Sequence, residues 1–316
     1  MGYKSKTVVL GVLSVLLILA FLFYDVGTNW QYILSKRTAK VLAIVLTGGA
    51  IAFSTVIFQT ITNNRILTPN IMGFDSLYLL IQTVIVFLLG STTLTMMNNN
   101  VHFLMTVGIM VVFALLLYKI LFKRNDQNIY FLLLIGIIFG TFFESFSSFM
   151  QVLIDPNEFQ IVQDRMFASF NNIKTDLLLV ASILIVLVTL YFVPFMKYLD
   201  VLALGREHAV NLGVDYDYVV KRLLIVVAIL ISIATALVGP ITFLGLLVVN
   251  VTYEFLKTYR HSFLIISSIF IAIIALVGGQ LVVERIFTFS TTLSVILNFV
   301  GGVYFIYLLL KENKSW

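Results

Sequence analysis

The sequence predicts an all-α membrane protein that crosses the bilayer many times. Hydrophobic residues make up 60% of the 316-residue chain, and charged residues make up only 11%. Soluble proteins carry roughly 25% charged residues, so this chain has too few polar side chains to cover a surface that faces water. Long charge-poor stretches recur along the sequence, and a spanning helix needs about 20 mostly apolar residues. These observations predict one transmembrane domain over residues 1–316.

Ten segments are predicted to span the membrane. The first follows Lys4 and Lys6 and resembles a signal peptide, but no small-x-small cleavage site follows it, which predicts a retained helix. The seventh and eighth come from one uncharged run, Leu223–Tyr253, which Gly239-Pro240 is expected to divide because proline cannot continue a helix. The ten predicted segments are 7–24, 41–62, 71–92, 101–121, 129–153, 177–196, 219–238, 241–256, 262–283 and 291–310.

The distribution of Lys and Arg predicts the orientation of the chain. With the N-terminus inside, fourteen basic residues fall on the inner side and six on the outer side, and the inner side of a membrane protein usually carries the excess. Both termini and residues 197–222 are therefore predicted to be cytoplasmic. The basic residues predicted to lie outside are Lys36, Arg37, Lys40, Arg165, Lys174 and Arg285.

The sequence offers no motif for catalysis or for a resident cofactor. It has no cysteine, no nucleotide-binding glycine loop and no His-Glu-x-x-His motif. His102, His208 and His261 are far apart, so no metal site is expected. The basic residues are scattered over loops, which argues against nucleic-acid binding. Transport is the function class that these exclusions favour.

Glu144 is a carboxylate inside the fifth predicted span, among Ser145, Ser147, Ser148 and Gln151. A charged side chain in the bilayer centre costs about 2.5–3.5 kcal/mol on insertion scales, so it should face protein or water. Two interpretations stay open. Glu144 lines a translocation pathway, or it lies near the outer end of its helix, where it is paired or reaches the interface.

Several short motifs occur in order over residues 37–310. Together they resemble the permeases of iron–siderophore, haem and cobalamin ABC importers, the FecCD type. The departures include Ala39 for a proline, Asn250 for a histidine and Gln280 for an aspartate. The motifs are RTAK at 37–40, Ser54 with Gln59, NNRILTPNIMGFDS at 63–76, AVNLG at 209–213, VGPITFLGLLVVN at 238–250, YRHSFL at 259–264 and the segment 279–309 with Gly301, Phe305 and Leu308.

The resemblance implies a permease subunit with the ABC importer permease fold in the bacterial cytoplasmic membrane. Its implied partners are a second permease, a cytoplasmic ATPase dimer and an extracellular or periplasmic binding protein that delivers a ferric siderophore. Because the motifs are degenerate, the second permease is expected to be a related chain rather than an identical one. The identity of the siderophore stays open, as does haem or cobalamin, because these importers share one fold.

The resemblance also assigns three sets of site residues. Arg37, Lys40 and Arg285 are expected to dock the binding protein on the outer face, where the charge count places them independently; ordinary outer-loop charges are the alternative. The translocation pathway is expected to include Phe58, Gln59, Asn64, Pro69 and Gly73, and Glu144 joins this set from its position inside a span and not from the resemblance. Coupling to the ATPases is assigned to Ala203, Leu204, Gly205, Arg206, Glu207, Ala209, Leu212 and Gly213.

The coupling region, residues 197–222, has a local structure that can be predicted. Leu204-Gly205 and Leu212-Gly213 bracket a short helix, Arg206–Asn211, because glycine ends helices well. A second short helix is expected after Gly213, with Asp215 near its positive end. A solvated loop without a partner is the alternative to a coupling element.

Two other functions are compatible with the composition. A ten-helix secondary transporter of the drug/metabolite type has a similar length, and it should show two related five-helix halves and no long cytoplasmic connection after the sixth span. A membrane structural or assembly subunit would explain the apolar composition but none of the ordered motifs. The ordered motifs therefore favour the importer permease.

Overall fold

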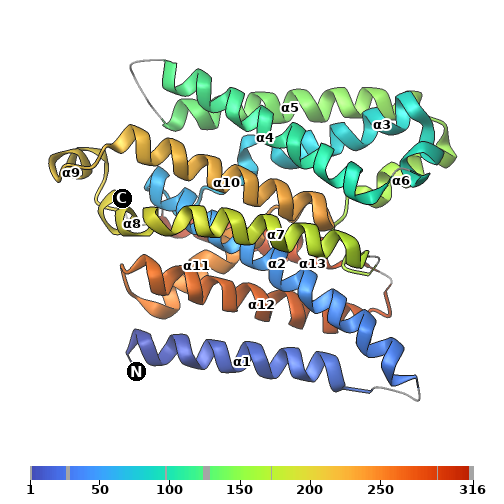
Figure 1. The fold of residues 1–316 in the computed structure, drawn as a ribbon, viewed down its shortest axis with the longest axis horizontal. Coiled ribbons are helices and arrows are strands. Elements are labelled where there is room, and N and C mark those ends of the chain that lie inside the picture. The colour runs from blue at the N-terminus through green and yellow to red at the C-terminus, as the bar shows by residue number, and fades with distance from the viewer. Residues whose placement is uncertain are drawn as a thin grey trace.

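The computed structural model describes residues 2–25, 29–96, 98–123, 129–171, 173–289 and 291–312. All regular structure in these residues is helical, which confirms the predicted all-α class. Figure 1 shows the long helices side by side along one common direction. The α-helices are α1 (Tyr3–Phe23), α2 (Trp30–Thr62), α3 (Phe74–Met96), α4 (Asn99–Lys123), α5 (Ile129–Leu153), α6 (Pro156–Arg165), α7 (Thr175–Phe192), α8 (Met196–Leu202), α9 (Arg206–Asn211), α10 (Tyr216–Val238), α11 (Leu244–Leu256), α12 (His261–Arg285) and α13 (Leu293–Glu312), with the 3-10 helices η1 (Pro69–Met72) and η2 (Val193–Phe195).

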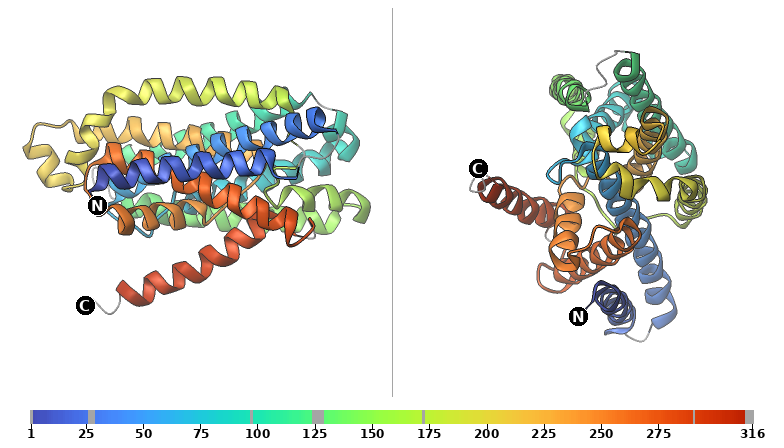
Figure 2. Two further views of the ribbon diagram at one scale, coloured as in Figure 1. Left: turned by 90° about the horizontal axis from the view of Figure 1, so that it is seen from below. Right: turned by 90° about the vertical axis from the view of Figure 1, so that its left-hand side faces the viewer.

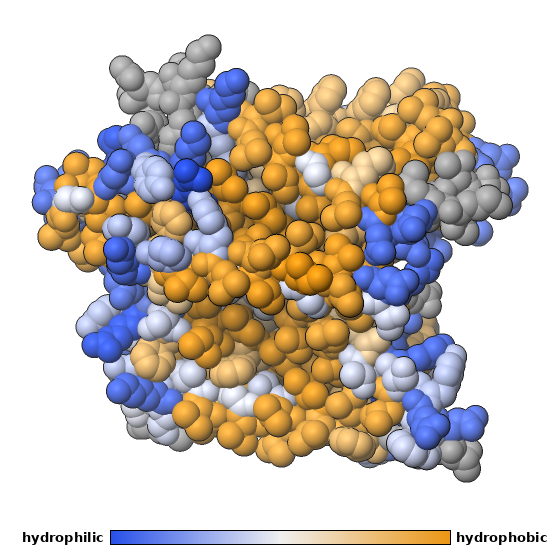
Figure 3. All heavy atoms as spheres, in the orientation of Figure 1, coloured by the Kyte–Doolittle hydropathy of each residue, from blue (hydrophilic) through white to orange (hydrophobic). Residues whose placement is uncertain are grey.

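Seven helices in the described residues are long and apolar enough to cross a membrane. Three shorter apolar segments, Phe74–Gly90, Leu244–Leu256 and Leu293–Leu308, overlap the other predicted spans. The count of ten spans therefore stays a prediction. Figure 3 shows an apolar surface across the middle of the molecule and hydrophilic side chains toward its two ends, the distribution expected of a protein that crosses a bilayer.

The two ends of the bundle carry different elements. α9, the start of α1 and the last turn of α13 lie at one end, and α6 lies at the other (Figures 1 and 2). We call these the α9 end and the α6 end. The start of α1, the last turn of α13 and the coupling region thus share one side, as the charge count predicts, while the cytoplasmic location of that side stays a prediction.

α2 and α10 form the centre of the bundle and are the most buried of the long apolar helices, with 78% and 72% of their apolar windows buried. α10 packs against α2, α4 and α7, and α12 packs against α2 and α1. α1 covers the outside of this arrangement and is only 17% buried. Figure 2 shows α13 diverging from the bundle toward its C-terminal end.

The predicted break at Gly239-Pro240 is confirmed. α10 ends at Val238, and Gly239 has a φ of +100°, a conformation that a side chain would strain. α11 begins only at Leu244, so residues 239–243 are non-helical within the bundle.

The prediction of a second short helix after Gly213 is wrong. Asp215 instead begins α10, a 23-residue helix, and its carboxylate accepts a hydrogen bond from the Tyr218 N–H. This N-cap connects directly to an apolar segment that packs on α2, so the helix continues instead of ending after one turn.

A second interruption separates α2 from α3. After Thr62 the chain turns at Asn63 and folds back between other helices as residues 63–73, which include η1. η1 packs against α5 because two glycines there leave room for its backbone. A Cβ atom at Gly136 would lie 2.7 Å from the Met72 Cα atom, and one at Gly73 would lie 2.9 Å from the Gly140 Cα atom.

Replacing Gly136 with alanine is expected to lower the stability of the protein by about 1–3 kcal/mol, because the added methyl group meets rigid backbone. The matched control is Gly108→Ala on α4, where the added methyl group would meet open space, with no atom of another element within 4 Å. Thermal unfolding in detergent should show a lower Tm for Gly136→Ala only. Equal Tm values for the two variants would contradict the close approach of η1 to α5.

Candidate functional site

The short helix α9 has the boundaries that the sequence predicts, Arg206–Asn211. Gly205 before it and Gly213 after it have φ values of +93° and +81°, which only glycine adopts without cost. The Val214 N–H donates a hydrogen bond to the Ala209 carbonyl at 3.1 Å and closes the C-terminal end. The paired Leu-Gly spacing therefore has a structural cause at both ends of the helix.

The coupling residues have two different environments. Ala209 is fully buried, whereas Leu204 and Leu212 are 56% and 64% exposed. Val210, which the sequence analysis did not single out, is also exposed. Ala203, Arg206 and Glu207 are exposed too, and an Arg206 guanidinium nitrogen lies 3.9 Å from an Asp217 carboxylate oxygen. Large apolar side chains on a polar end of the molecule are typical of a partner-binding surface.

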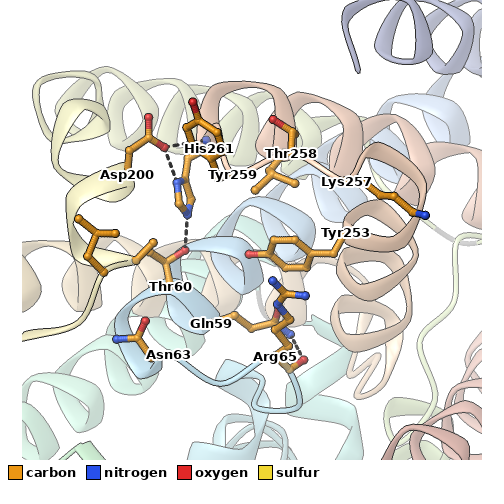
Figure 4. Close-up of a pocket in the computed structure, with 13 residues that line it drawn as sticks. Gln59, Thr60, Asn63, Arg65, Asp200, Tyr253, Lys257, Thr258, Tyr259 and His261 are labelled. Atoms are coloured by element: carbon orange, nitrogen blue, oxygen red, sulfur yellow. Dashed lines mark hydrogen bonds and ion pairs between the residues drawn. The ribbon is translucent and has the colours of Figure 1, made fainter. Parts of the chain in front are cut away.

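A cavity of about 640 Å³ lies behind the coupling region, at the α9 end of α2 (Figure 4). The Arg65 guanidinium stacks over the Tyr253 ring at 4.5 Å from its centre. The Arg65 carbonyl accepts hydrogen bonds from the Gln59 side chain at 2.6 Å and from the Asn250 side chain at 2.9 Å. The cavity is lined by Gln59, Thr60, Asn63, Arg65, Asp200, Ala203, Leu204, Tyr253, Lys257, Thr258, Tyr259, His261 and Leu264.

The predicted pathway residues occupy several environments. Gln59 lines the cavity, but its neighbour Phe58 is fully buried. The Asn64 carboxamide oxygen accepts a hydrogen bond from the Ile66 N–H at 2.9 Å and so shapes the turn after α2. Pro69 begins η1 and Gly73 ends it. Four of these five residues thus form or support the interrupted segment 63–73, and a direct contact with a ligand stays a prediction.

A carboxylate that the sequence analysis did not single out, Asp75, joins the two interruptions. The Asn70 carboxamide nitrogen donates to both of its oxygens, at 3.2 and 3.1 Å, and the Thr242 hydroxyl donates to one of them at 2.9 Å. Asp75 lies in the first turn of α3, and Thr242 lies just before α11. The positive ends of two helix dipoles therefore converge on this negative charge. We call Asn70, Asp75 and Thr242 the Asp75 junction.

Glu144 lies on an exposed face of α5, away from both the cavity and the Asp75 junction. Thr141, Ser145 and Ser148 share this exposed face at helical spacing. On another side of the helix, Ser147 is buried and hydrogen-bonds to Thr83 on α3 at 2.8 Å. Because a carboxylate facing hydrocarbon is costly, this polar face of α5 is suited to water or to another protein chain.

The three predicted docking residues come together at the α6 end, where α1, α2 and α12 meet. Arg37 donates to the carbonyl oxygens of the last turn of α1, with the shortest distance, 2.7 Å, to that of Tyr24. The Lys40 ammonium lies 2.7 Å from a Glu284 carboxylate oxygen, and this pair is mostly buried. Arg285 makes a more exposed pair with Asp25, also at 2.7 Å. We call Arg37, Lys40 and Arg285, with their acidic partners Glu284 and Asp25, the outer cluster.

A second cavity, of about 510 Å³, opens at the α6 end between α3, α6 and α10. Its lining includes Tyr78 and Arg165, and the sequence analysis gave neither a role. α6 was not predicted from the sequence, although Asp155-Pro156 is a recognisable signal for the start of a helix. The Asp155 carboxylate caps this helix by accepting a hydrogen bond from the Asn157 N–H at 2.9 Å.

Comparison with known proteins decides the family. Residues 7–311 match the FecCD transport family. The chain belongs to this family. It is 67% identical to the petrobactin import system permease protein YclO of Bacillus subtilis, over the full length of both chains. It is also similar to two petrobactin import system permeases of Bacillus anthracis. FatC is 36% identical over 89% of this chain and 79% of its own, and FatD is 28% identical over 88% and 81%.

The fold agrees with this family membership. A structure described as a metal-chelate type ABC transporter in an inward-facing conformation matches 98% of this chain and all of the compared chain, with a TM-score of 0.83 at 20% identity. The predicted ABC importer permease fold is therefore confirmed. The comparisons also favour the iron–siderophore importer permease over the secondary transporter, so this FecCD-family chain is a transport subunit and not an enzyme.

Replacing Asp75 with leucine is expected to destabilise the FecCD-family chain by about 1–3 kcal/mol, because the donors on Asn70 and Thr242 lose their buried acceptor. Asp176→Leu is the matched control, since Asp176 also lies in the first turn of a helix but is exposed. Thermal unfolding in detergent should separate the two variants. A Tm for Asp75→Leu equal to that of Asp176→Leu would show that the junction contributes nothing to stability.

Proposed function

We propose that this chain is a membrane permease that imports a ferric siderophore of the petrobactin type across the bacterial cytoplasmic membrane. The observation that carries the proposal is its 67% identity, over the full length, to a permease named for petrobactin import. In the proposed cycle a binding protein delivers the ferric siderophore at the α6 end, and ATPases at the α9 end drive its release into the cytoplasm. The chain supplies half of the pathway, and the ATP is hydrolysed by other subunits.

The second half of the pathway is proposed to come from a related chain and not from a second copy. Two different petrobactin permeases of one organism, FatC and FatD of Bacillus anthracis, both resemble this chain, and FatC resembles it more. The partner would then be a FatD-like permease. The exposed polar face of α5 around Glu144 is the proposed surface toward this partner and the pathway, because it would otherwise meet hydrocarbon.

The coupling region is proposed to bind an ATPase subunit through α9. Its exposed Leu204, Val210 and Leu212 offer apolar contact area, and Arg206 and Glu207 offer charges around it. Ala209 and the two glycines would act differently, by fixing the shape of α9 against the rest of the chain. A loop that only contacts solvent would not explain why three apolar side chains are exposed on and beside α9, whose ends are fixed by two glycines.

The outer cluster is proposed to dock the binding protein. Arg285 is the best placed of the three residues, because its side chain is 39% exposed and its partner Asp25 is 66% exposed. Lys40 is mostly buried with Glu284, so its main contribution would be to hold α2 against α12. Arg37 would likewise hold the end of α1. The cavity lined by Arg165 lies at the same end and is the proposed entry for the ligand.

A complementation experiment tests the proposed function. In a Bacillus subtilis strain that lacks YclO, this chain is expected to restore uptake of radioactive iron supplied as ferric petrobactin, because 67% identity should preserve the contacts with the remaining subunits. Uptake is measured in iron-starved cells, with the chain detected in the membrane fraction. A chain that reaches the membrane but restores no uptake would contradict the proposal. Uptake of other ferric siderophores, without uptake of ferric petrobactin, would contradict the proposed substrate.

Charge reversal tests the proposed docking surface. Arg285→Glu is expected to weaken binding of the binding protein several-fold at low salt, because an exposed ion pair is worth under about 1 kcal/mol and is replaced by repulsion. Lys36→Glu is the control, since Lys36 is exposed on α2 but makes none of the contacts of the outer cluster. Affinity and its salt dependence are measured with the importer in nanodiscs. Equal affinities for both variants would refute the assignment.

A further inference from the structure

One imidazole ring connects three elements at the α9 end. His261, the first residue of α12, is almost completely buried, with 4% of its side chain exposed. Its Nδ1 atom lies 2.6 Å from an oxygen of Asp200 on α8, and its Nε2 atom lies 2.9 Å from the hydroxyl of Thr60 on α2 (Figure 4). The His261 backbone N–H also donates to the same Asp200 oxygen, at 2.9 Å.

The two ring nitrogens of His261 contact two different kinds of partner. The Asp200 carboxylate can only accept, so Nδ1 of the ring donates to it. A hydrogen bond to a carboxylate is charge-assisted, in agreement with the short distance. The second bond joins Nε2 to the Thr60 hydroxyl, and the tautomer of the ring decides which of these two atoms donates. The Thr60 hydroxyl also lies 2.8 Å from the Val56 carbonyl oxygen, one turn earlier on α2.

Each partner of His261 belongs to an element with a proposed part in transport. Asp200 lies on α8, which leads through Gly205 directly into α9. Thr60 lies in the last turn of α2, next to Gln59, whose side chain holds the start of segment 63–73. α8 also packs against both α2 and α12. A displacement of α9 by an ATPase would therefore reach His261 through a short helix and one hydrogen bond to a carboxylate.

We propose that Asp200, His261 and Thr60 form a relay that transmits movement of the coupling helix α9 to α2 and the pathway segment after it. His261 is a positioning residue, because it is proposed to act through Thr60. The relay rests on the proposed function, since it requires an ATPase bound at α9. Asp200 is half-exposed, so it can move together with α8. His261 and Thr60 are buried, so the hydrogen bond between them stays in place on α2.

The relay is tested with the complete importer, reconstituted with its partner permease, ATPases and binding protein in liposomes, and with ferric petrobactin as the ligand. Two quantities are measured, ATP hydrolysed and iron imported, and their ratio reports coupling. Thr60→Val keeps the shape of the side chain but removes the hydroxyl. We expect the iron imported per ATP to fall about threefold to tenfold, since the loss of one buried hydrogen bond changes an equilibrium by about that factor. Thr60→Ser, which restores the hydroxyl, should recover the ratio.

The controls separate a relay from a merely structural role. Thr189→Val removes the same kind of i−4 hydrogen bond, from the Thr189 hydroxyl to the Ile185 carbonyl, on an exposed face of α7, and should leave the ratio unchanged. Asp200→Asn should lower the ratio from the other end of the relay. The double variant with Thr60→Val should be no worse than the worse single variant, because both interrupt one connection. These measurements use assemblies whose thermal stability matches that of the unsubstituted importer.

The outcomes distinguish the relay from the function on which it rests. An unsubstituted importer that couples normally, together with unchanged ratios in Thr60→Val and Asp200→Asn, would overturn the relay alone. If bulky substitution of Ala209 uncouples transport in the same experiment, the role of α9 stands and the connection runs elsewhere. Absence of ligand-stimulated ATP hydrolysis in the unsubstituted importer would overturn the proposed function and the relay with it.

Discussion

The interior of a bilayer offers no hydrogen-bond partners, so every interruption of a helix inside this bundle must be satisfied by the chain itself. Two interruptions in the described part of the chain, after α2 and after α10, show how this is achieved. The interruption after α2 is held by the side chains of Gln59 and Asn250, which donate to the Arg65 carbonyl. The two interruptions are connected through Asp75, whose carboxylate accepts from Asn70 in the first and from Thr242 in the second. The arrangement of α3, α5 and α11 follows from this requirement, because each supports one of the interrupted segments.

Satisfying the interruptions internally also requires close packing. η1 reaches α5 only because Gly136 and Gly140 carry no side chain, and Gly245 on α11 approaches Thr55 on α2 equally closely. Because lipid chains are as apolar as these helix surfaces, dispersion contacts and interhelical hydrogen bonds supply much of the stability that the hydrophobic effect gives to soluble proteins. The interrupted segments are therefore fixed at their ends and cannot move independently of α2, α3 and α5. Movement in such a structure is expected to be a shift of whole helices.

The sequence predicts the local features well and the long-range contacts poorly. α9 and the end of α10 are predictable because glycine and proline act within a few residues of where they stand. The role of Asp75 was not predicted because it depends on a hydrogen bond from Thr242, which is 167 positions away in the sequence. The family resemblance selected Arg37, Lys40 and Arg285, and charge counting placed them outside. Their pairings, such as Lys40 with Glu284, connect segments that only the fold brings together. The start of α10 was predicted as a separate short helix because Asp215 signals a helix start but not how far that helix extends.

The two ends of the molecule present different chemistry, and the difference fits the proposed partners. At the α6 end the ion pair of Arg285 and Asp25 is exposed, beside apolar side chains such as that of Ile286. At the α9 end Leu204, Val210 and Leu212 expose apolar surface on a short rigid helix. Ionic contacts at a rim favour fast association and stay weak, which suits a binding protein that must leave after each delivery. Apolar contacts bury area and favour lasting association, which suits ATPases that stay bound through many cycles. The exposed ion pair at one end and the apolar surface of α9 at the other thus agree with the proposed transient and permanent partners.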